Sequence, residues 1–412
     1  MNHFITNIHV NKLFHLNNFD ISIADENHPH LIITGKNGSG KTILLNALAD
    51  FLGIIKEDTN MNFTTYEKYL DYWISQINKP SATQKEKMDA KQNSAYYSEL
   101  LQNLYGKVNI SFNDIGDIIE KYQKGQFVIA FYEAARVVKM SEPKNPTKPQ
   151  YNKKGKVKET ATSQFLNFLS DLKIQEALAR NENQDKDADS IGEWFNDFRK
   201  LLQDVYQDPN LTLEFNYKDY GFHICTEGKR FKFTEVSDGF SAILDIIADL
   251  ILKMQGDNSV SNEYQKEGIV LIDEIETHLH LGLQKAILPL LTKLFPNIQF
   301  IVTTHSPFVL NSIPNAVAYD LEHSEILEDL TEYSYEALAE GYFGVKTPSS
   351  YVEMQLNNLH TLLEKKDWSD SDKIEVKRLA SDFDKIPETI SPLIVGEYRQ
   401  LVVKYANRIK EL

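Results

Sequence analysis

The residues best suited to chemistry in this chain lie in a glycine-rich segment at positions 35–42. Its sequence, GKNGSGKT, fits the pattern G-x-x-x-x-G-K-[ST], follows an apolar run at 31–34 and precedes apolar residues at helical spacing. In such a loop, backbone N–H groups surround phosphate oxygens, and the N-terminus of the next helix adds positive potential. We expect a phosphate-binding loop made of Gly35, Lys36, Asn37, Gly38, Ser39, Gly40, Lys41 and Thr42.

Two side chains of this loop are expected to hold ATP and Mg²⁺. The Lys41 ammonium should reach the β- and γ-phosphates and neutralise charge there during catalysis, and Thr42 should offer its hydroxyl oxygen to the cation. The alternative is a glycine turn that fits the pattern by chance. The strand before the segment and the helix after it argue against that alternative.

A second candidate is the apolar run at 269–272, which ends in two carboxylates. Sheets of α/β proteins place ligands at the edge where such strands end. Asp273 is predicted to hold Mg²⁺ through its water shell, and Glu274 to polarise the attacking water as a general base. An ordinary strand followed by acids that cap a helix is the alternative.

A third candidate is His305, which follows the apolar run at 300–303. One strand–helix–strand crossover separates it from Asp273, so it should lie near the γ-phosphate, where an imidazole senses phosphate or orients water. A lone histidine at a strand end is often structural, and that reading stays open. Metal binding with the nearby Glu276, His278 and His280 is not favoured.

Alternating and continuous apolar patterns predict the elements that position these residues. Strands are expected at 4–10, 19–23, 31–34, 127–132, 211–217, 221–225, 230–233, 269–272 and 300–303. Helices are expected at 43–52, 163–179, 191–205, 240–254 and 283–294, with further helices and no strands from 351 onward. A buried parallel sheet with crossover helices follows from this order.

Composition limits the class of protein. The chain has 412 residues, 42% of them hydrophobic, enough for two or three compact units. Cys225 is the only cysteine, so no disulfide within the chain is possible and a reducing compartment is expected. No apolar run is long enough for a membrane span, and positions 1–10 lack the pattern of a signal peptide. These features predict a cytoplasmic protein without a membrane partner.

The net charge of −15 opposes broad binding to nucleic acid. One local exception runs from Lys139 to Lys158, with seven lysines, a single acid, Glu142, and three prolines. Local contact with DNA through this segment is one interpretation. A solvated loop is the other, and charge runs favour it.

These motifs together resemble the ATPase core shared by ABC-type, structural-maintenance-of-chromosomes, RecF and overcoming-lysogenisation-defect proteins. The resemblance rests on Asp273 and Glu274, the run 276–280, and the run 304–307. It also implies a signature motif, which the residues 236–240 resemble. In that family Ser237 and Gly239 would contact the γ-phosphate bound by the opposite subunit of a dimer. An ordinary helix cap at Ser237 is the alternative.

The sequence departs from the family pattern at three positions, Val236, Ile275 and Leu281, where leucine, proline and proline are common. None of these changes removes a chemical group. Long heptad arms are absent between the phosphate-binding loop and the signature, which disfavours the long-armed members.

The resemblance implies an α/β fold, an ABC-type P-loop ATPase core with a mixed sheet. We expect this core at 1–58 and 205–325, a mostly helical insertion with a basic loop at 59–204, and a helical module at 326–412. Among short-armed relatives, the chain resembles ATPases of bacterial anti-phage defence and retron-type operons, which work beside a separate effector protein. A homodimer or higher oligomer is therefore expected.

No nuclease activity is expected from this chain. Acids at 369–372 and 381–384 stand in helical sequence, and no parallel strands precede them as they do in Toprim nucleases. Two alternatives to a defence ATPase stay open. One is a DNA-repair ATPase of RecF type, and the other is an assembly scaffold that uses ATP only to hold its oligomer.

Overall fold

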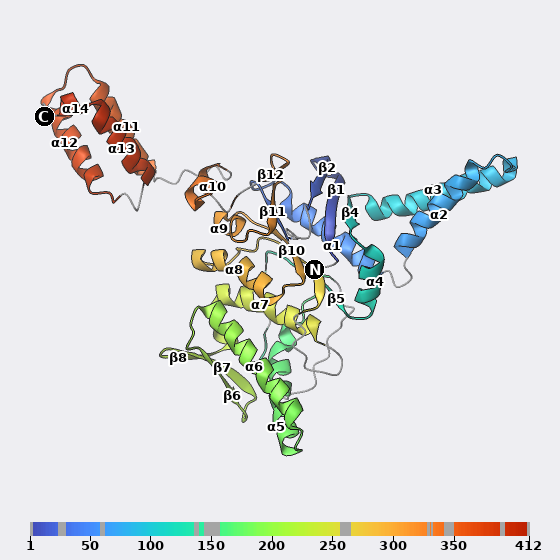
Figure 1. The fold of residues 1–412 in the computed structure, drawn as a ribbon. Coiled ribbons are helices and arrows are strands. Elements are labelled where there is room, and N and C mark those ends of the chain that lie inside the picture. The colour runs from blue at the N-terminus through green and yellow to red at the C-terminus, as the bar shows by residue number, and fades with distance from the viewer. Residues whose placement is uncertain are drawn as a thin grey trace. The chain divides into compact units, whose positions relative to one another are not determined.

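The chain folds into two compact units, residues 1–333 and 334–412 (Figure 1). The computed structural model describes residues 3–23, 30–57, 62–135, 140–143, 157–255, 265–327, 330, 333–341, 350–387 and 392–409. In this part of the chain, every strand belongs to the first unit. No described helix is both long enough and apolar enough to cross a membrane.

A six-stranded sheet forms the centre of the first unit. Its order is β12 (Glu325–Leu327), β11 (Ala316–Asp320), β3 (His30–Thr34), β10 (Ile298–Thr303), β9 (Glu267–Ile272) and β5 (Phe127–Tyr132). The last five run parallel, and β12 pairs antiparallel with β11. Strands β3, β10 and the edge strand β5 are buried along their whole length, which explains their continuous apolar sequence. The predicted α/β fold with a mixed sheet is confirmed.

A second sheet, in the order β2 (Leu16–Ser22), β1 (Ile5–Leu13) and β4 (Val108–Phe112), is antiparallel. Helix α1 (Lys41–Glu57) contacts both sheets, and its apolar residues join the same buried cluster as those of β1 and β3. A side chain also joins the sheets. Gln299 in β10 is fully buried, accepts a hydrogen bond from the Ile5 N–H at 2.8 Å and donates to the Ile5 carbonyl at 3.0 Å.

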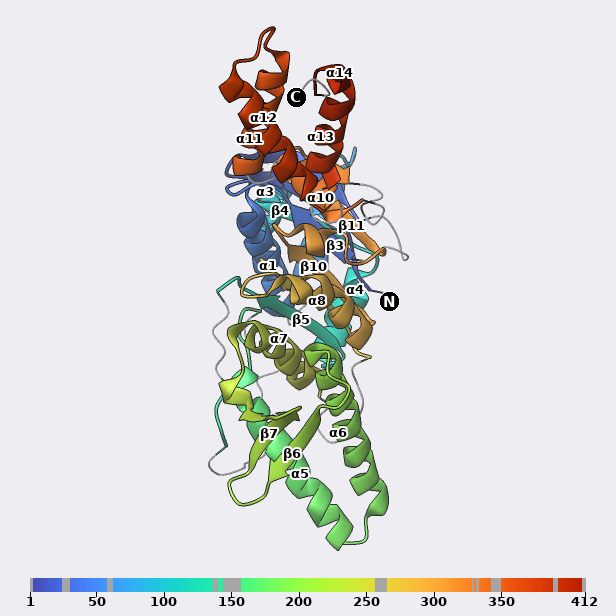
Figure 2. The same ribbon diagram turned by 90° about the vertical axis from the view of Figure 1, so that its left-hand side faces the viewer.

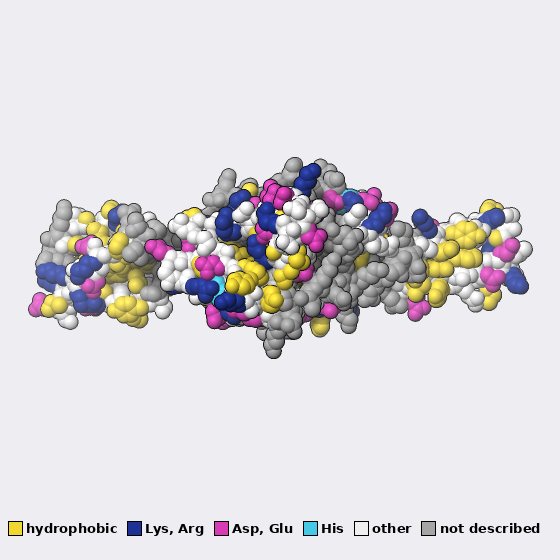
Figure 3. All heavy atoms as spheres, turned by 90° about the horizontal axis from the view of Figure 1, so that it is seen from below, with side chains coloured by type: hydrophobic (Ala, Val, Ile, Leu, Met, Phe, Trp, Pro, Cys, Tyr) yellow, Lys and Arg dark blue, Asp and Glu magenta, His cyan; other side chains and the backbone are white. Residues whose placement is uncertain are grey.

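Two helical hairpins extend from this unit. The first pairs α2 (Asn62–Ile77) with α3 (Gln84–Tyr105), which begins with a capping box between Thr83 and Glu86. Hydrophobic side chains lie along its surface, at the right of Figure 3; the exposed ones are Tyr69, Tyr72, Ile74, Met88 and Tyr96. The second pairs α5 (Phe165–Asn181) with α6 (Asp185–Tyr206) around the buried Trp194.

A third sheet, β6 (Thr212–Asn216), β7 (Gly221–Thr226) and β8 (Lys229–Lys232), is an antiparallel meander beside α5 and α6. Helix α7 (Asp238–Met254) lies between this sheet and β5 (Figure 2). Short elements complete the unit: α4 (Ile115–Gln123), α8 (Leu281–Leu294), α9 (Pro307–Leu310) and the 3-10 helices η1 (Thr162–Gln164) and η2 (Phe233–Glu235).

The second unit is helical where the structure describes it. It contains α10 (Tyr335–Gly341), α11 (Ser350–Glu364), α12 (Asp370–Asp384), α13 (Pro392–Lys404) and α14 (Ala406–Ile409). Leucines of α11 and α12 pack with Phe383 and Tyr398 in a separate core. The Tyr398 hydroxyl donates to Asp384 at 2.9 Å.

Strands β4 and β5 come from the stretch 59–204, which the sequence predicts to be mostly helical. β5 completes one edge of the central sheet, where it lies next to β9. Of the predicted basic segment at 139–158, only 140–143 and 157–158 are among the described residues.

Candidate functional site

The glycine-rich loop connects the end of β3 to the start of α1. Gly35 and Gly40 have φ angles of 130° and 103°, which side-chain-bearing residues rarely adopt. A Cβ atom at Gly40 would also come within 2.9 Å of the Leu16 Cδ1 atom. The backbone conformation therefore requires glycine at these positions, and a side chain at Gly40 would also displace the end of Leu16. The loop leads into a helix N-terminus, which favours an anionic ligand.

Lys41 points into this loop. Its side chain is buried, and Nζ donates to the carbonyls of Gly35 at 2.8 Å and Lys36 at 3.1 Å. Burial lowers the pKa of Lys41, while the nearby carboxylates, Glu274 foremost, act in the opposite direction. The ammonium is thus held by the loop's own carbonyls at the place where phosphate oxygens of a nucleotide would be received.

Thr42 and Asp273 meet although 231 positions separate them in the chain. The Thr42 hydroxyl donates to Asp273 Oδ1 at 3.2 Å. The hydroxyl of Thr303, the last residue of β10, donates to the same oxygen at 2.7 Å. Hydroxyl and carboxylate oxygens are the ligands that Mg²⁺ prefers. The residues present therefore fit a magnesium ion beside the phosphate-binding loop.

Glu274 has an unusual backbone, with a φ angle of 41°. Its N–H donates to the Thr303 hydroxyl at 2.7 Å, and its carboxylate accepts a hydrogen bond from Thr277 at 3.3 Å. A left-handed conformation costs a non-glycine residue about 1–2 kcal/mol and persists only where neighbours hold it. Thr303 is such a neighbour, because it binds both Asp273 and Glu274.

Glu276 fixes the backbone around His305. Its carboxylate accepts hydrogen bonds from the Thr304 hydroxyl at 2.8 Å and from the His305 N–H at 2.5 Å. Burial raises the pKa of Glu276. Burial, and then the charge of Lys41, lower the pKa of His305, which favours a neutral imidazole. Glu276 thus serves the loop after β10, while His278 and His280 are exposed.

The signature-like residues stand at the head of α7. Ser237 is exposed at the N-cap position, and its side chain makes no capping hydrogen bond. A Cβ atom at Gly239 would lie 2.8 Å from the His278 carbonyl oxygen, so glycine lets the helix approach the loop that follows Asp273. Phe240 stacks on Tyr206 with ring centroids 4.3 Å apart. An ordinary side-chain cap does not account for Ser237.

Comparison with known proteins agrees with this geometry. The family model described as an AAA domain, putative AbiEii toxin, Type IV TA system, matches residues 137–311, which include Ser237, Asp273, Glu274 and His305. The loop at 35–42 lies outside the match; it connects β3 to α1 and holds the Lys41 side chain. The fold and motifs of the chain resemble those of ABC/SMC-like P-loop ATPases.

Proteins similar to this chain include the Septu protein PtuA of Bacillus mycoides (strain KBAB4), which is 25% identical over 403 residues. That alignment covers 94% of this chain and 52% of PtuA, so the chain spans about half the length of this relative. The Retron Vc95 probable ATPase of Vibrio cholerae serotype O1 biovar El Tor is 24% identical over 368 residues, 75% of this chain and 70% of that protein. A solved SMC head bound to the C-winged helix domain of ScpA aligns over 78% of this chain and 96% of its own, with 14% identity and a TM-score of 0.38.

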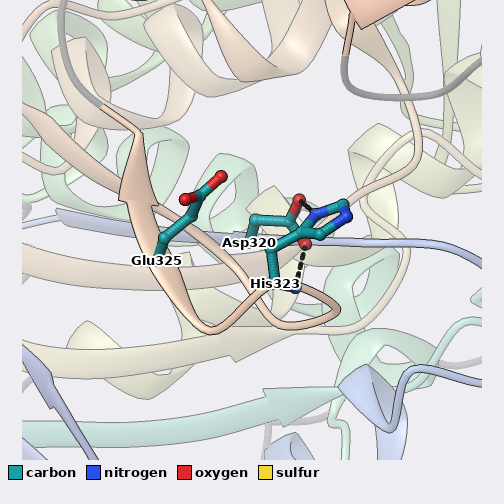
Figure 4. A group of neighbouring side chains, drawn as sticks. All are labelled: Asp320, His323 and Glu325. Carbon is teal, nitrogen blue, oxygen red and sulfur yellow. Dashed lines mark hydrogen bonds and ion pairs between the residues drawn. The ribbon is translucent and has the colours of Figure 1, made fainter.

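One further cluster lies beside the glycine-rich loop at 35–42. Ligand atoms of Asp320, His323 and Glu325 lie within 4.8 Å of one another (Figure 4). The Asp320 carboxylate already accepts hydrogen bonds from the N–H of Glu322 at 2.8 Å and from the His323 ring at 2.7 Å. Glu322 in turn pairs with Lys36 at 2.8 Å. These bonds explain the cluster as a turn between β11 and β12 that is tied to the phosphate-binding loop.

One edge of the sheet therefore holds the predicted phosphate-binding loop together with Asp273, Glu274 and His305. Ser237 lies at the start of a separate helix. Sequence reasoning missed Thr303 and assigned no role to Glu276. The sequence around each of these two residues contains a feature that could have indicated its role. Thr303 is a polar residue at the end of an apolar strand, and Glu276 is a third acid in the segment after β9.

Proposed function

We propose that this chain hydrolyses ATP at a site that a second copy completes. The observation that carries the proposal is the separation of two groups. Lys41, Thr42 and Asp273 gather at one sheet edge, whereas Ser237 is exposed at the head of α7 without a capping bond. An exposed serine at a helix N-terminus suits a phosphate that belongs to another chain.

Each residue has a proposed part in hydrolysis. The backbone N–H groups of residues 35–40 bind the phosphates. The Lys41 ammonium leaves the loop carbonyls and binds oxygens of the β- and γ-phosphates instead. Thr42 and Asp273 would hold Mg²⁺, which when bound supplies positive charge at the phosphates. Glu274 accepts a proton from the attacking water, and neutral His305 orients that water or contacts the γ-phosphate.

We also propose that this ATPase acts in anti-phage defence as the sensor or regulatory component. A separate effector protein would carry out the defensive activity. The likeness to a Septu protein over 94% of the chain and to a retron ATPase over 75% supports this role. We propose that the chain lacks nuclease activity and that any DNA contact is local, through the segment Lys139–Lys158.

Mixing two inactive variants tests the shared site. Lys41→Ala removes the cation of the loop, and Ser237→Arg blocks the signature. In a mixed dimer, one site carries both lesions and the other carries neither, so about half of wild-type turnover per mixed dimer should return. Ser75→Arg, the same exchange on the exposed face of α2, is the control for the added arginine and should hydrolyse ATP as the wild type does.

Native mass spectrometry establishes that mixed dimers form. If they form and activity stays absent, Ser237 does not act across the dimer. If Lys41→Ala alone keeps wild-type turnover, the assigned nucleotide site is wrong. A Glu274→Gln chain that does not hydrolyse ATP but keeps its full biological activity would favour a scaffold over a hydrolase.

A further inference from the structure

We infer that Tyr132 and Asp249 form a buried link that positions the helix of Ser237 against the strand end that carries Asp273. This inference rests on the proposed composite site. Neither side chain is among those proposed to bind ATP or Mg²⁺, so each is proposed as a positioning residue rather than a catalytic one.

Tyr132 is the last residue of β5 and contacts the two parts of the site at its two ends. Its carbonyl accepts a hydrogen bond from the Asp273 N–H at 2.8 Å. Its hydroxyl donates to Asp249 Oδ2 at 2.7 Å. The ring between these groups is 2% exposed, so neither bond competes with bulk water. One residue therefore joins the backbone beside the predicted magnesium ligand to helix α7.

Asp249 is fully buried in α7, and donors from three segments surround its carboxylate. Besides Tyr132, the Ala161 N–H donates to Oδ1 at 2.6 Å, and Lys253 in the next turn of α7 forms an ion pair with Oδ2. Lys253 also donates to the Glu159 carbonyl at 2.9 Å. The carboxylate thus gathers β5, the segment before η1 and the helix itself.

The position of Asp249 in the helix explains the proposed role. It lies about 18 Å, or roughly three helical turns, beyond Ser237 along α7. Because a helix moves nearly as a rigid rod, fixing its rotation at Asp249 also fixes where Ser237 points. Lys253 keeps the charge of Asp249 paired when the tyrosine hydroxyl is removed, so a Tyr132→Phe chain retains its fold while this helix loses its hydrogen bond to β5.

Tyr132→Phe, placed in a Glu274→Gln background, tests the link without requiring turnover. Nucleotide affinity of the separate chain should stay within about threefold of the parent, since Lys41 and Thr42 are untouched. The protein concentration needed for ATP-driven association, measured by light scattering, should rise about 10-fold, as expected for a lost bond to a charged group. In the chain with Glu274 intact, kcat should fall by a similar factor while KM changes little.

Two comparisons separate positioning from mere stability. Tyr398→Phe removes the same kind of tyrosine–aspartate bond in the second unit and should leave association and kcat unchanged. Asp249→Asn should reproduce the loss, and the double variant with Tyr132→Phe should be little worse than Asp249→Asn alone. Unchanged association and kcat in Tyr132→Phe, or an equal loss in Tyr398→Phe, would overturn the inference. If the wild type associates with ATP but does not hydrolyse it, the proposed function is wrong. The association assay would still test whether the Tyr132–Asp249 bond positions α7.

Discussion

Replacing Thr303 by valine should show how much one hydroxyl contributes to the site. Valine keeps the branched shape in a position that is fully buried. The exchange removes a bond to the Asp273 carboxylate and the acceptor of the Glu274 N–H, both 2.7 Å long. A bond to a charged group contributes about 1.5–3 kcal/mol and a neutral one about 0.5–1.5 kcal/mol, so unfolding free energy should drop by about 2–4 kcal/mol.

Thr34→Val is the matched control. Thr34 ends the neighbouring strand β3, it is 1% exposed, and its hydroxyl oxygen has no hydrogen-bond partner among the described residues. Removing an unpaired buried hydroxyl should leave stability unchanged or raise it by up to about 1 kcal/mol. The difference between the two variants therefore measures the bonds of Thr303 rather than the change of side chain.

Urea unfolding gives the free energies, and ATPase kinetics give the catalytic effect. With Thr303 gone, Glu274 loses the contact that holds its φ of 41°, and kcat should fall about 10- to 100-fold. If Thr303→Val and Thr34→Val agree within about 0.5 kcal/mol in stability and about twofold in kcat, the reasoning about this hydroxyl is refuted.

Two further predictions concern charge and pH. Glu274→Gln keeps the shape of the side chain but removes the base, so an ATP-bound dimer should accumulate in light scattering, and association no greater than that of the wild type would argue against closure of a composite site. Burial lowers the pKa of His30 to about 4 from 6.5, and its Nδ1 accepts a hydrogen bond from the Phe300 N–H at 3.2 Å. Between these pH values the unfolded chain binds the proton and the folded chain does not, so stability should fall by about 3 kcal/mol as pH drops from 6.5 to 4. Urea unfolding of His30→Gln should lack this additional loss, and an identical pH dependence in both chains would contradict it.

The sequence predicts the parts of this site that depend on local pattern. The phosphate-binding loop needs glycines at fixed spacing between a strand and a helix, and the buried strands need continuous apolar runs, so 31–42 and 269–274 are recognisable alone. The order of these runs predicts a parallel sheet with crossover helices, the family resemblance implies a mixed sheet, and the α/β fold with a mixed sheet is confirmed.

Contacts between distant residues leave no such pattern. Tyr132 and Asp249 are 117 positions apart, and nothing in either local sequence indicates that they meet. Strand β4 was not predicted for another reason. Val108–Phe112 follows a long helix, and its alternating pattern of buried and exposed residues is only five residues long. The backbone of Glu274 is likewise set by the neighbouring strand through Thr303 rather than by its own sequence.

Gln299 shows how the two sheets of the first unit are kept in register. A glutamine side chain ends in an amide, so its NH₂ group can donate and its carbonyl oxygen can accept, as the N–H and carbonyl of a peptide group do. The Gln299 side chain bonds both backbone groups of Ile5, as a neighbouring strand would, and so links β1 to β10. Sliding β1 by a single residue would reverse its faces and break both bonds at once. The two hydrogen bonds of Gln299 therefore fix β1 of the antiparallel sheet relative to β10, the strand that ends at Thr303, and helix α1 packs against both sheets.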